Sequence, residues 1–459
     1  MNDPAFDPEL IARYDVPGPR YTSYPTAPQF DSSFGADDYR RHARASNAGG
    51  APLSLYVHIP FCATVCFYCG CNKIVTKRHE RAAPYLQGLA TEIARQGELF
   101  ERTRTVEQLH FGGGTPTFID HGEMTGLMEA LQRNFRLCDD DRGDYSIEID
   151  PRTVDARRIA QLRALGFNRL SLGVQDFDPV VQRAVNRLQS EAQTVAIFDA
   201  ARTEGFRSIN IDLIYGLPHQ TLESFAVTLD KIVALRPERL SVFNYAHLPE
   251  RFPPQRRILA ADLPTPAQKL DILQATLRRL TAAGYVYIGM DHFALPGDAL
   301  AQAQARGVLH RNFQGYTTHG ACDLVGLGLS AIGNVGHCYA QNMADLDTYL
   351  GRVNGGRLPI AHGLALTTGD RLRRDVIMQL ICNFRLDMRA IQRRHAIAFE
   401  DYFAAELRAL AALAHDELVL LGKDEITVTP LGKFLVRNIC MVFDDYLKTS
   451  PQHKYSRAV

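Results

Sequence analysis

The sequence lacks the features of a membrane protein, a secreted protein or a nucleic-acid-binding protein. Its 459 residues include no apolar run that approaches the roughly 20 residues needed to span a bilayer. Its first residues show no charged segment followed by an apolar stretch, so we expect no secretory signal and a cytoplasmic location. Its 51 basic residues balance 51 acidic ones, which leaves no net charge to attract nucleic acid or an anionic membrane.

Cysteine is also scarce and unevenly placed. Only nine cysteines occur, and four of them lie between Cys62 and Cys71, while the other five are scattered singly. Disulfide scaffolds are short, secreted chains with evenly distributed cysteines, and this distribution excludes them. A tight cysteine cluster in a long chain instead indicates metal or redox chemistry.

Much of the chain alternates between short apolar runs and longer charged segments with helical periodicity. This alternation is typical of repeated strand–helix units that build a parallel sheet. Six units fall short of the eight that close a full barrel, so we expect an α/β fold with an incomplete (β/α)6 barrel. The six apolar runs span residues 53–60, 108–114, 145–151, 169–175, 208–218 and 239–249.

Two flanking regions differ from this pattern. Residues 1–50 are rich in proline, which resists helix and strand interiors, but Tyr21, Tyr24 and their neighbours are too aromatic for a disordered leader. We therefore expect an N-terminal arm that lies across another surface. Residues 361–459 are rich in Ala, Leu and Arg and predict a mainly helical C-terminal domain. The barrel, with an extension, is expected to occupy residues 51–360.

Cys62, Cys66 and Cys69 follow the first predicted strand with C-x3-C-x2-C spacing. This spacing fits neither the paired arms of a zinc site nor a lone C-x-x-C redox pair, whereas thiolates are the usual ligands of iron–sulfur clusters. Three ligands hold three irons of a four-iron four-sulfur cluster and leave the fourth iron open for chemistry. Cys71 is an alternative fourth ligand, and a cluster closed in that way would serve only electron transfer or structure.

Small or polar residues stand where the other predicted strands end. In a barrel of parallel strands, ligand-binding residues gather at these carboxyl ends. The glycines at 112–114 let a ligand approach the backbone and its N–H groups. Glu148 and Asp212 suit ribose hydroxyls, and Arg187 suits a carboxylate. Further residues at these ends are Thr115, Asp150, Gln175 and Ala246.

The cysteine spacing, with the aromatic Tyr68 just before the third cysteine, resembles the signature of the radical S-adenosylmethionine superfamily. That resemblance implies an incomplete six-stranded barrel and an open iron that chelates S-adenosylmethionine. Blocks over nearly the whole chain resemble one family within it, the oxygen-independent coproporphyrinogen III oxidases. These blocks are GPRYTSYPTA (18–27), LYVHIPFC (55–62), CGCNKI (69–74), FGGGTPT (111–117), NRLSLGVQDF (168–177), NIDLIYGLP (210–218), LSVFNYAHLP (240–249), IGMDHFA (288–294), LHRNFQGYTT (309–318) and ICNFRLD (381–387).

The family resemblance implies a reaction and its cofactors. The expected reaction is the oxidative decarboxylation of two propionate side chains of coproporphyrinogen III to vinyl groups, which gives protoporphyrinogen IX in anaerobic haem biosynthesis. The resemblance implies one 4Fe-4S cluster, two molecules of S-adenosylmethionine, an external electron donor and an electron acceptor. We expect the chain to act as a monomer.

Residue matches to the family imply a set of contacts. The first S-adenosylmethionine is expected to contact Tyr56, Tyr68, Gly113, Glu148 and Ile332. The second is expected to contact Gly114, Thr115, Gln175, Arg187, Asp212 and Ala246. The negative propionates call for cations and hydrogen-bond donors, and the candidates are Arg20, His58, Arg311 and Gln314. Cys71 stands where a cysteine marks the family, and its catalytic role is undetermined.

A haem chaperone from the same branch of the superfamily is the nearest alternative. As that group is known, its members lack the cysteine at the position of Cys71 and the RYTSYPTA arm, and they carry a Tyr-Trp motif near the block at 309–318. This sequence has Cys71 and the arm, and it contains no tryptophan. These differences favour the oxidase.

Overall fold

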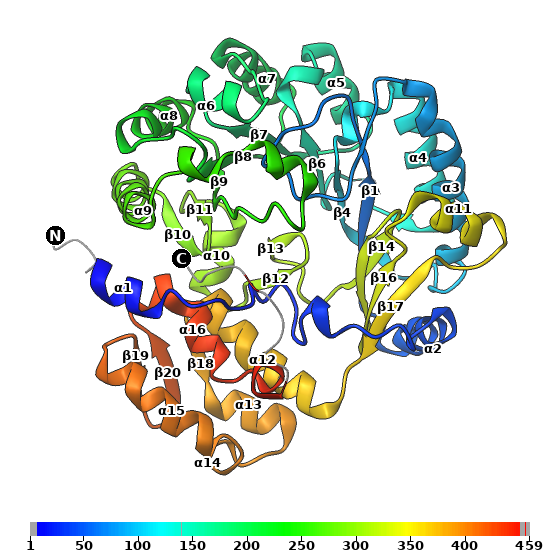
Figure 1. Ribbon diagram of the computed structural model, residues 1–459. Helices are drawn as coiled ribbons and strands as arrows, with labels where there is room; N and C mark the ends of the chain where they lie inside the picture. Colours follow the sequence, from blue (N-terminus) through cyan, green and yellow to red (C-terminus); the bar gives the residue numbers. More distant parts are fainter. Residues whose placement is uncertain (1–6, 139, 450–454, 456–459) are drawn as a thin grey trace. The chain divides into compact units, whose positions relative to one another are not determined.

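The computed structural model describes residues 7–138, 140–449 and 455, which form two compact units (Figure 1). The barrel unit comprises residues 30–265 and 321–365. The helical unit comprises the described parts of residues 1–29, 266–320 and 366–459. The segment 266–320 thus groups with the C-terminal region, whereas the sequence analysis placed it within the 51–360 domain.

Six parallel strands form the core of the barrel unit, in the order β9-β8-β7-β6-β4-β1. Each of the six predicted runs overlaps one of them, so the incomplete barrel is confirmed. Figure 1 shows these strands side by side along a curved sheet. The strands are β1 (Leu53–Ile59), β4 (Thr105–Gly113), β6 (Asp144–Ile149), β7 (Arg169–Gln175), β8 (Ser208–Tyr215) and β9 (Arg239–Asn244).

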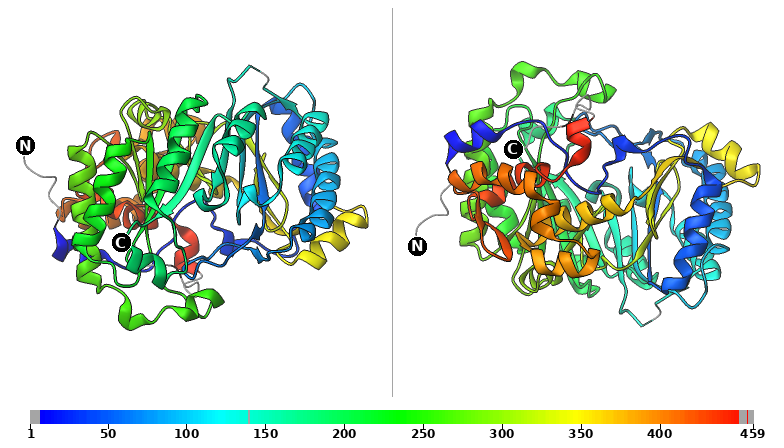
Figure 2. Two further views of the ribbon diagram at one scale, coloured as in Figure 1. Left: turned by 90° about the horizontal axis from the view of Figure 1, so that it is seen from above. Right: turned by 90° about the horizontal axis from the view of Figure 1, so that it is seen from below.

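Helices follow these strands and cover the outer face of the curved sheet (Figures 1 and 2). Several begin at capping boxes, in which an N-cap side chain and the third helical residue satisfy each other's backbone N–H groups. Asp120, Ser190 and Thr221 are the N-cap residues of three such helices. The covering helices are α3 (Ala83–Gly97), α4 (His121–Asn134), α5 (Ala156–Ala164), α6 (Pro179–Ala184), α7 (Glu191–Thr203) and α8 (Leu222–Leu235).

Alternation along the strands separates an apolar face from a polar one. In β6 and β7, the buried residues Ile147, Ile149 and Leu172 alternate with the partly exposed Glu148 and Ser171. Because successive side chains of a strand point to opposite faces, the apolar set packs under the helices and the polar set faces the interior of the barrel. Glu148 pairs in register with Ser171 on the neighbouring strand, which gathers polar groups at one place on the inner face.

Four further strands extend the sheet beyond β1, and the sequence analysis did not predict them individually. β14 lies parallel to β1, and each of the next three strands runs antiparallel to the strand before it. The extension consists of β14 (Asp323–Leu327), β15 (Ile332–Val335), β16 (Cys338–Asn342) and β17 (Ile360–Ala365), with helices α2 (Ala36–Ser46) and α11 (Leu346–Asn354). A short strand, β5 (Arg136–Leu137), pairs with β4.

The helical unit contains residues 7–29 of the predicted N-terminal arm and most of the C-terminal region, whereas residues 30–50 belong to the barrel unit. Tyr21 and Tyr24 are buried in its core, and the Tyr21 hydroxyl donates to Asp444 over 2.9 Å. The two tyrosines therefore anchor this segment in the core of the helical unit. The C-terminal helices are also present, together with a small antiparallel sheet in the order β18-β20-β19.

The elements of the helical unit before residue 330 are α1 (Pro8–Tyr14), α9 (Pro266–Ala282), β10 (Val286–Gly289), β11 (His292–Ala294), α10 (Ala299–Ala305), β12 (His310–Asn312) and β13 (Gly315–Thr317). Those after it are α12 (Thr368–Asn383), β18 (Arg385–Asp387), α13 (Met388–His395), α14 (Phe399–Tyr402), α15 (Ala404–His415), β19 (Val419–Leu421), β20 (Glu425–Val428), α16 (Val436–Met441) and α17 (Asp445–Thr449).

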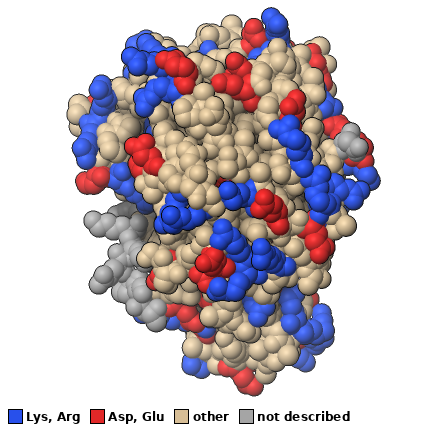
Figure 3. All heavy atoms as spheres, turned by 90° about the vertical axis from the view of Figure 1, so that its right-hand side faces the viewer, with Lys and Arg blue, Asp and Glu red and all other residues tan. Residues whose placement is uncertain are grey.

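The surface agrees with the balanced composition. Lysine and arginine side chains are interspersed with acidic ones over the face shown in Figure 3. Among the described residues, no helix is both long enough and apolar enough to cross a bilayer.

Candidate active site

The cysteine loop leaves the carboxyl end of β1 and is closed at its base by a two-strand ladder. β2 (Phe61–Cys62) pairs with β3 (Ile74–Val75), and the Thr76 N–H donates to the Cys62 carbonyl over 2.9 Å. The loop between these strands therefore starts and ends beside the barrel mouth. The three predicted cluster ligands, Cys62, Cys66 and Cys69, all line one pocket of the barrel unit.

Most of the predicted site residues line the same pocket. They are Cys62, Cys66, Tyr68, Cys69, Cys71, Gly113, Gly114, Thr115, Glu148, Gln175, Arg187 and Asp212. Four candidates in the barrel unit are not among its lining residues, namely Tyr56, His58, Ala246 and Ile332. The sequence analysis missed several lining residues, and Lys73, Arg152 and Ser171 are the polar ones that bear on the site.

The glycine loop at the end of β4 is bonded to the start of the cysteine loop. Gly114 N–H donates to the Ile59 carbonyl and Thr115 N–H to the Phe61 carbonyl, each over 2.8 Å. Gly113 has φ of +116°, and a Cβ atom there would lie 2.7 Å from the His58 ring. Both the backbone angle and the close ring require glycine at this position. The two loops thus form one continuous wall of the pocket.

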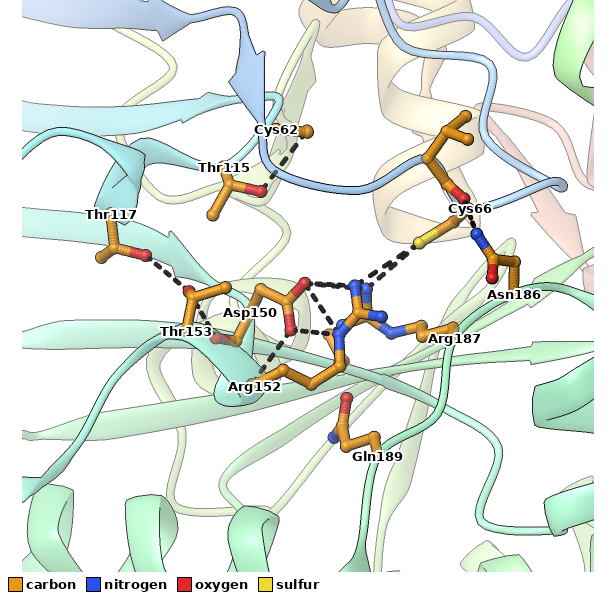
Figure 4. Close-up of polar contacts among 12 residues, drawn as sticks. Cys62, Cys66, Thr115, Thr117, Asp150, Arg152, Thr153, Asn186, Arg187 and Gln189 are labelled. Carbon is orange, nitrogen blue, oxygen red and sulfur yellow. Dashed lines mark hydrogen bonds and ion pairs between the residues drawn. The ribbon is translucent and has the colours of Figure 1, made fainter. Parts of the chain in front are cut away.

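Hydrogen-bond donors point at the sulfur atoms of Cys62 and Cys66 (Figure 4). The Thr115 hydroxyl donates to Cys62 Sγ over 3.4 Å. Arg152 Nη2 and Arg187 Nη1 each lie 3.6 Å from Cys66 Sγ. Such donors favour the thiolate form, which is the form that binds iron.

Asp150 holds the two arginines in place. Its carboxylate contacts Arg152 Nη2 at 2.6 Å and Arg187 Nη1 at 3.2 Å. Burial opposes ionisation of Asp150, but the hydrogen bonds from Arg152 and the charge of Arg187 outweigh it and hold its pKa below the usual value. Arg187 also donates from Nη2 to the Gly173 carbonyl.

The cysteine thiols differ in their acidity. Burial raises the pKa of Cys62 to about 11, although the Thr115 hydrogen bond opposes this shift. A hydrogen bond from the Cys71 thiol is the main reason that the pKa of Cys69 falls to about 6. As the donor of that bond, Cys71 has a raised pKa. Cys71 therefore lies beside a predicted cluster ligand and acts on it as a hydrogen-bond donor.

Tyr56 and His58 form a pair on β1. His58 Nε2 lies 3.0 Å from the Asn72 carbonyl oxygen, and because a carbonyl only accepts, Nε2 carries the proton. His58 Nδ1 then accepts from the Tyr56 hydroxyl at 3.0 Å. Burial lowers the pKa of His58 and keeps the ring neutral. Both ring nitrogens of His58, a predicted substrate contact, are therefore hydrogen-bonded to other groups of the protein.

The two acidic candidates on the inner face are held by neighbouring polar groups. Glu148 accepts from the Gly113 N–H at 3.2 Å and lies 3.3 Å from His110 Nε2. Asp212 accepts from the Ser171 hydroxyl at 2.7 Å, and burial raises the pKa of its carboxyl group. Fixed carboxylates of this kind can receive hydroxyl groups of a ligand without reorganising.

Two of the remaining candidates in the barrel unit lie at element ends. Ile332 begins β15 and is partly buried, and Ala246 follows β9 and is exposed.

The three candidates in the helical unit have different surroundings. Arg20 forms a salt bridge with Asp291. Gln314 lies in the turn between β12 and β13 and is partly exposed. Arg311 is buried with its guanidinium 4.7 Å from the Tyr316 ring centre, and its Nε and Nη1 atoms make no hydrogen bond within the described residues.

The pocket fits a thiolate-bound cluster accompanied by an organic ligand that carries an acceptor group. Arg187 is 6% exposed, yet its Nε atom has no hydrogen-bond partner among the described residues. A buried donor of this kind carries a desolvation cost unless a bound acceptor satisfies it. A carboxylate placed beside Arg187 would supply that acceptor.

Comparisons with known proteins match both units. The model of the radical SAM superfamily matches residues 56–232, and that of the HemN C-terminal domain matches residues 366–435. The oxygen-independent coproporphyrinogen III oxidase of Pseudomonas aeruginosa is 56% identical over 99% of both chains. The protein of the same name from Escherichia coli is 52% identical over 99% of this chain and 98% of its own length.

One solved structure resembles the whole chain. It is described as coproporphyrinogen III oxidase (HemN) from Escherichia coli, a radical SAM enzyme. It superposes with a TM-score of 0.92 at 52% identity, and the match covers 97% of this chain and 100% of that one.

Proposed function

This chain belongs to the family of oxygen-independent coproporphyrinogen III oxidases, and we propose that the pocket around Cys62, Cys66 and Cys69 is its active site. The reaction is the oxidative decarboxylation of two propionates of coproporphyrinogen III to vinyl groups, which gives protoporphyrinogen IX in haem biosynthesis. The observation that carries the site assignment is the convergence of three cysteines, the glycine loop and inner-face carboxylates on one pocket.

Cys62, Cys66 and Cys69 are the proposed ligands of one 4Fe-4S cluster. Thr115 and Arg152 support this assignment, because they aim hydrogen bonds at ligand sulfurs. When bound, the reduced cluster and S-adenosylmethionine together supply the carbon-centred radical that removes hydrogen from a propionate side chain. The protein's own residues bind and orient the reactants and exclude water.

The pocket is proposed to bind two molecules of S-adenosylmethionine through separate sets of residues. Tyr56, Tyr68, Gly113, Glu148 and Ile332 are the proposed contacts of the first. Gly114, Thr115, Gln175, Arg187, Asp212 and Ala246 are the proposed contacts of the second. The buried Nε atom of Arg187 has no hydrogen-bond partner among the described residues. This supports the binding of the carboxylate of the second S-adenosylmethionine beside Arg187.

Arg311 is the residue best suited to bind a propionate of the substrate. Its guanidinium is buried, and two of its nitrogens lack partners among the described residues, which an incoming carboxylate would satisfy. Gln314, on the adjacent turn, is proposed as a second contact. His58 is hydrogen-bonded to the Asn72 carbonyl, and Arg20 forms a salt bridge with Asp291. We therefore propose that His58 positions the site and that Arg20 positions the arm.

The electron partners, the oligomeric state and the cellular location are also proposals. The substrate must lose electrons as it is decarboxylated, and cluster reduction needs one electron, so we propose an external electron acceptor and an external one-electron donor. We further propose that the chain acts as a monomer in the cytoplasm.

The test is turnover by the anaerobically reconstituted, reduced chain. Incubation with S-adenosylmethionine and coproporphyrinogen III should yield protoporphyrinogen IX and 5′-deoxyadenosine. Cleavage of S-adenosylmethionine without decarboxylation would contradict the oxidase assignment and favour the chaperone alternative.

A further inference from the structure

Cys66 differs from Cys62 in the charge of its surroundings. Two guanidinium groups approach its sulfur from different elements (Figure 4), and a nitrogen of each lies 3.6 Å from it. Arg152 comes from the turn after β6, and Arg187 from the segment after α6. Cys62, by contrast, receives the neutral hydroxyl of Thr115.

The turn after β6 fixes the direction of Arg152. The Asp150 carboxylate accepts from the backbone N–H of Arg152 at 3.1 Å, which caps the short helical turn at residues 151–153. The same carboxylate accepts from Arg152 Nε at 2.9 Å, so backbone and side chain are held by one group. Arg152 thus has little freedom to leave Cys66.

The charges around the sulfur do not cancel. Arg152 and Arg187 contribute two positive charges, and Asp150 contributes one negative charge that bridges them. All three side chains are mostly withdrawn from solvent, at 15%, 7% and 10% exposure, so the field is weakly screened. One net positive charge therefore lies beside Cys66.

We propose that Arg152, acting with Arg187 across Asp150, sets the reduction potential of the cluster through Cys66. This inference rests on the proposed function of the pocket and assigns a role to a residue that the sequence analysis missed. One electron from a low-potential donor such as dithionite adds one negative charge to the cluster. A fixed positive charge and N–H donors to a ligand sulfur stabilise that more negative state and make the potential less negative.

A purely structural role for the arginines predicts a different outcome. If the Asp150–Arg152–Arg187 group only joined the end of β6 to the segment after α6, removing either charge would loosen the site in the same way. An electrostatic role instead predicts opposite shifts, because Arg152 and Asp150 carry opposite charges. Asn at position 150 keeps an acceptor for the Arg152 N–H, so the turn is retained.

The experiment is a redox titration of the anaerobically reconstituted full chain without S-adenosylmethionine, followed by electron paramagnetic resonance. Arg152→Gln should shift the midpoint potential to more negative values, and Asp150→Asn should shift it to less negative values. Arg152→Lys keeps the charge and should shift it less than Arg152→Gln. Arg158→Gln is the matched control, because Arg158 is a partly buried arginine of the same unit that donates to the Ile119 carbonyl, and it should leave the potential unchanged.

Iron and sulfide contents are measured on every sample. An Arg152→Gln protein with a full cluster and the wild-type potential would overturn the inference, as would shifts of equal sign in Arg152→Gln and Asp150→Asn. If the Arg152→Gln protein fails to load a cluster, the Asp150→Asn protein provides the test. An unchanged midpoint potential in the Asp150→Asn protein would then overturn the inference. Failure of the proposed function is distinguishable, because it appears in the wild type as an absent cluster or as no cleavage of S-adenosylmethionine.

Discussion

The hydroxyl group of Tyr349 donates a 2.6 Å hydrogen bond to the carboxyl group of Glu92, which is fully buried in the barrel unit. Gly328 N–H and the Asn342 side chain donate to the same carboxyl group, at 2.8 and 2.7 Å. Through these bonds Glu92, on helix α3, holds the turn between β14 and β15 at Gly328 and the end of β16 at Asn342.

Replacing Glu92 with Gln should remove a pH dependence of stability. Burial raises the pKa of Glu92 to about 7, above the unfolded value near 4.3. The folded state therefore keeps this proton up to a higher pH than the unfolded state does. The wild-type free energy of unfolding should fall by about 3 kcal/mol as pH rises from about 4.5 to 7, and Glu92→Gln should lack this component. Urea unfolding at several pH values measures the difference. Glu98→Gln, at the exposed end of the same helix, should keep the wild-type slope.

Replacing Gly113 with Ala should damage the cofactor site. The backbone there has φ of +116°, and the new Cβ would meet the His58 ring at 2.7 Å. The strain of about 1–3 kcal/mol should displace the loop and weaken S-adenosylmethionine binding by about tenfold or more. Equilibrium binding to the reconstituted protein measures this loss. Gly126→Ala in α4 has no atom within 4 Å of the new Cβ and should bind normally.

Replacing Cys71 with Ser should leave the cluster intact. Cys71 is exposed and donates to Cys69, and a serine hydroxyl can donate in the same way. Iron and sulfide contents after anaerobic reconstitution should match those of the wild type, whereas Cys69→Ser should lose the cluster. Loss of nearly all iron from Cys71→Ser would show four cysteine ligands and favour the closed-cluster electron carrier.

Replacing Arg311 with Met should weaken substrate binding without destabilising the chain. Loss of a charge-assisted bond of about 1.5–3 kcal/mol should raise the KM for coproporphyrinogen III by about ten- to a hundredfold. Two nitrogens of Arg311 are already unsatisfied among the described residues, so their removal should not lower the thermal midpoint. A lower midpoint with unchanged KM would contradict the substrate role. Arg306→Gln, at the exposed end of α10, is the matched control.

The barrel was predictable because its strands carry strong patterns. In β6 and β7 every second residue is buried, and the polar residues Asp150, just after β6, and Gln175, at the end of β7, line the pocket. The cysteine spacing alone pointed to the loop whose cysteines line the pocket. These features depend on local sequence and on a general property of parallel barrels.

The extension beyond β1 was not predictable strand by strand. Its strands are short, and three of the four contain a glycine, a residue typical of turns and loops. The structure gives the reason, because a Cβ atom at Gly326 would lie 2.8 Å from the backbone of Ile332. Glycine there permits close packing of two strands, which only the three-dimensional arrangement reveals.

Arg152 was missed for a similar reason. An arginine three residues after the end of a strand reads as an exposed turn residue. Its approach to Cys66 depends on the Asp150 carboxylate, which bonds both its backbone and its side chain.

The partners of Cys66 also constrain the order in which the site is completed during synthesis. Arg152 lies 86 residues after Cys66 in the chain, and Arg187 lies 121 residues after it. The cysteine loop therefore leaves the ribosome well before either guanidinium exists, and β6 and α6 must fold before both reach the sulfur. A cluster inserted into the nascent loop would sit in an environment without these charges.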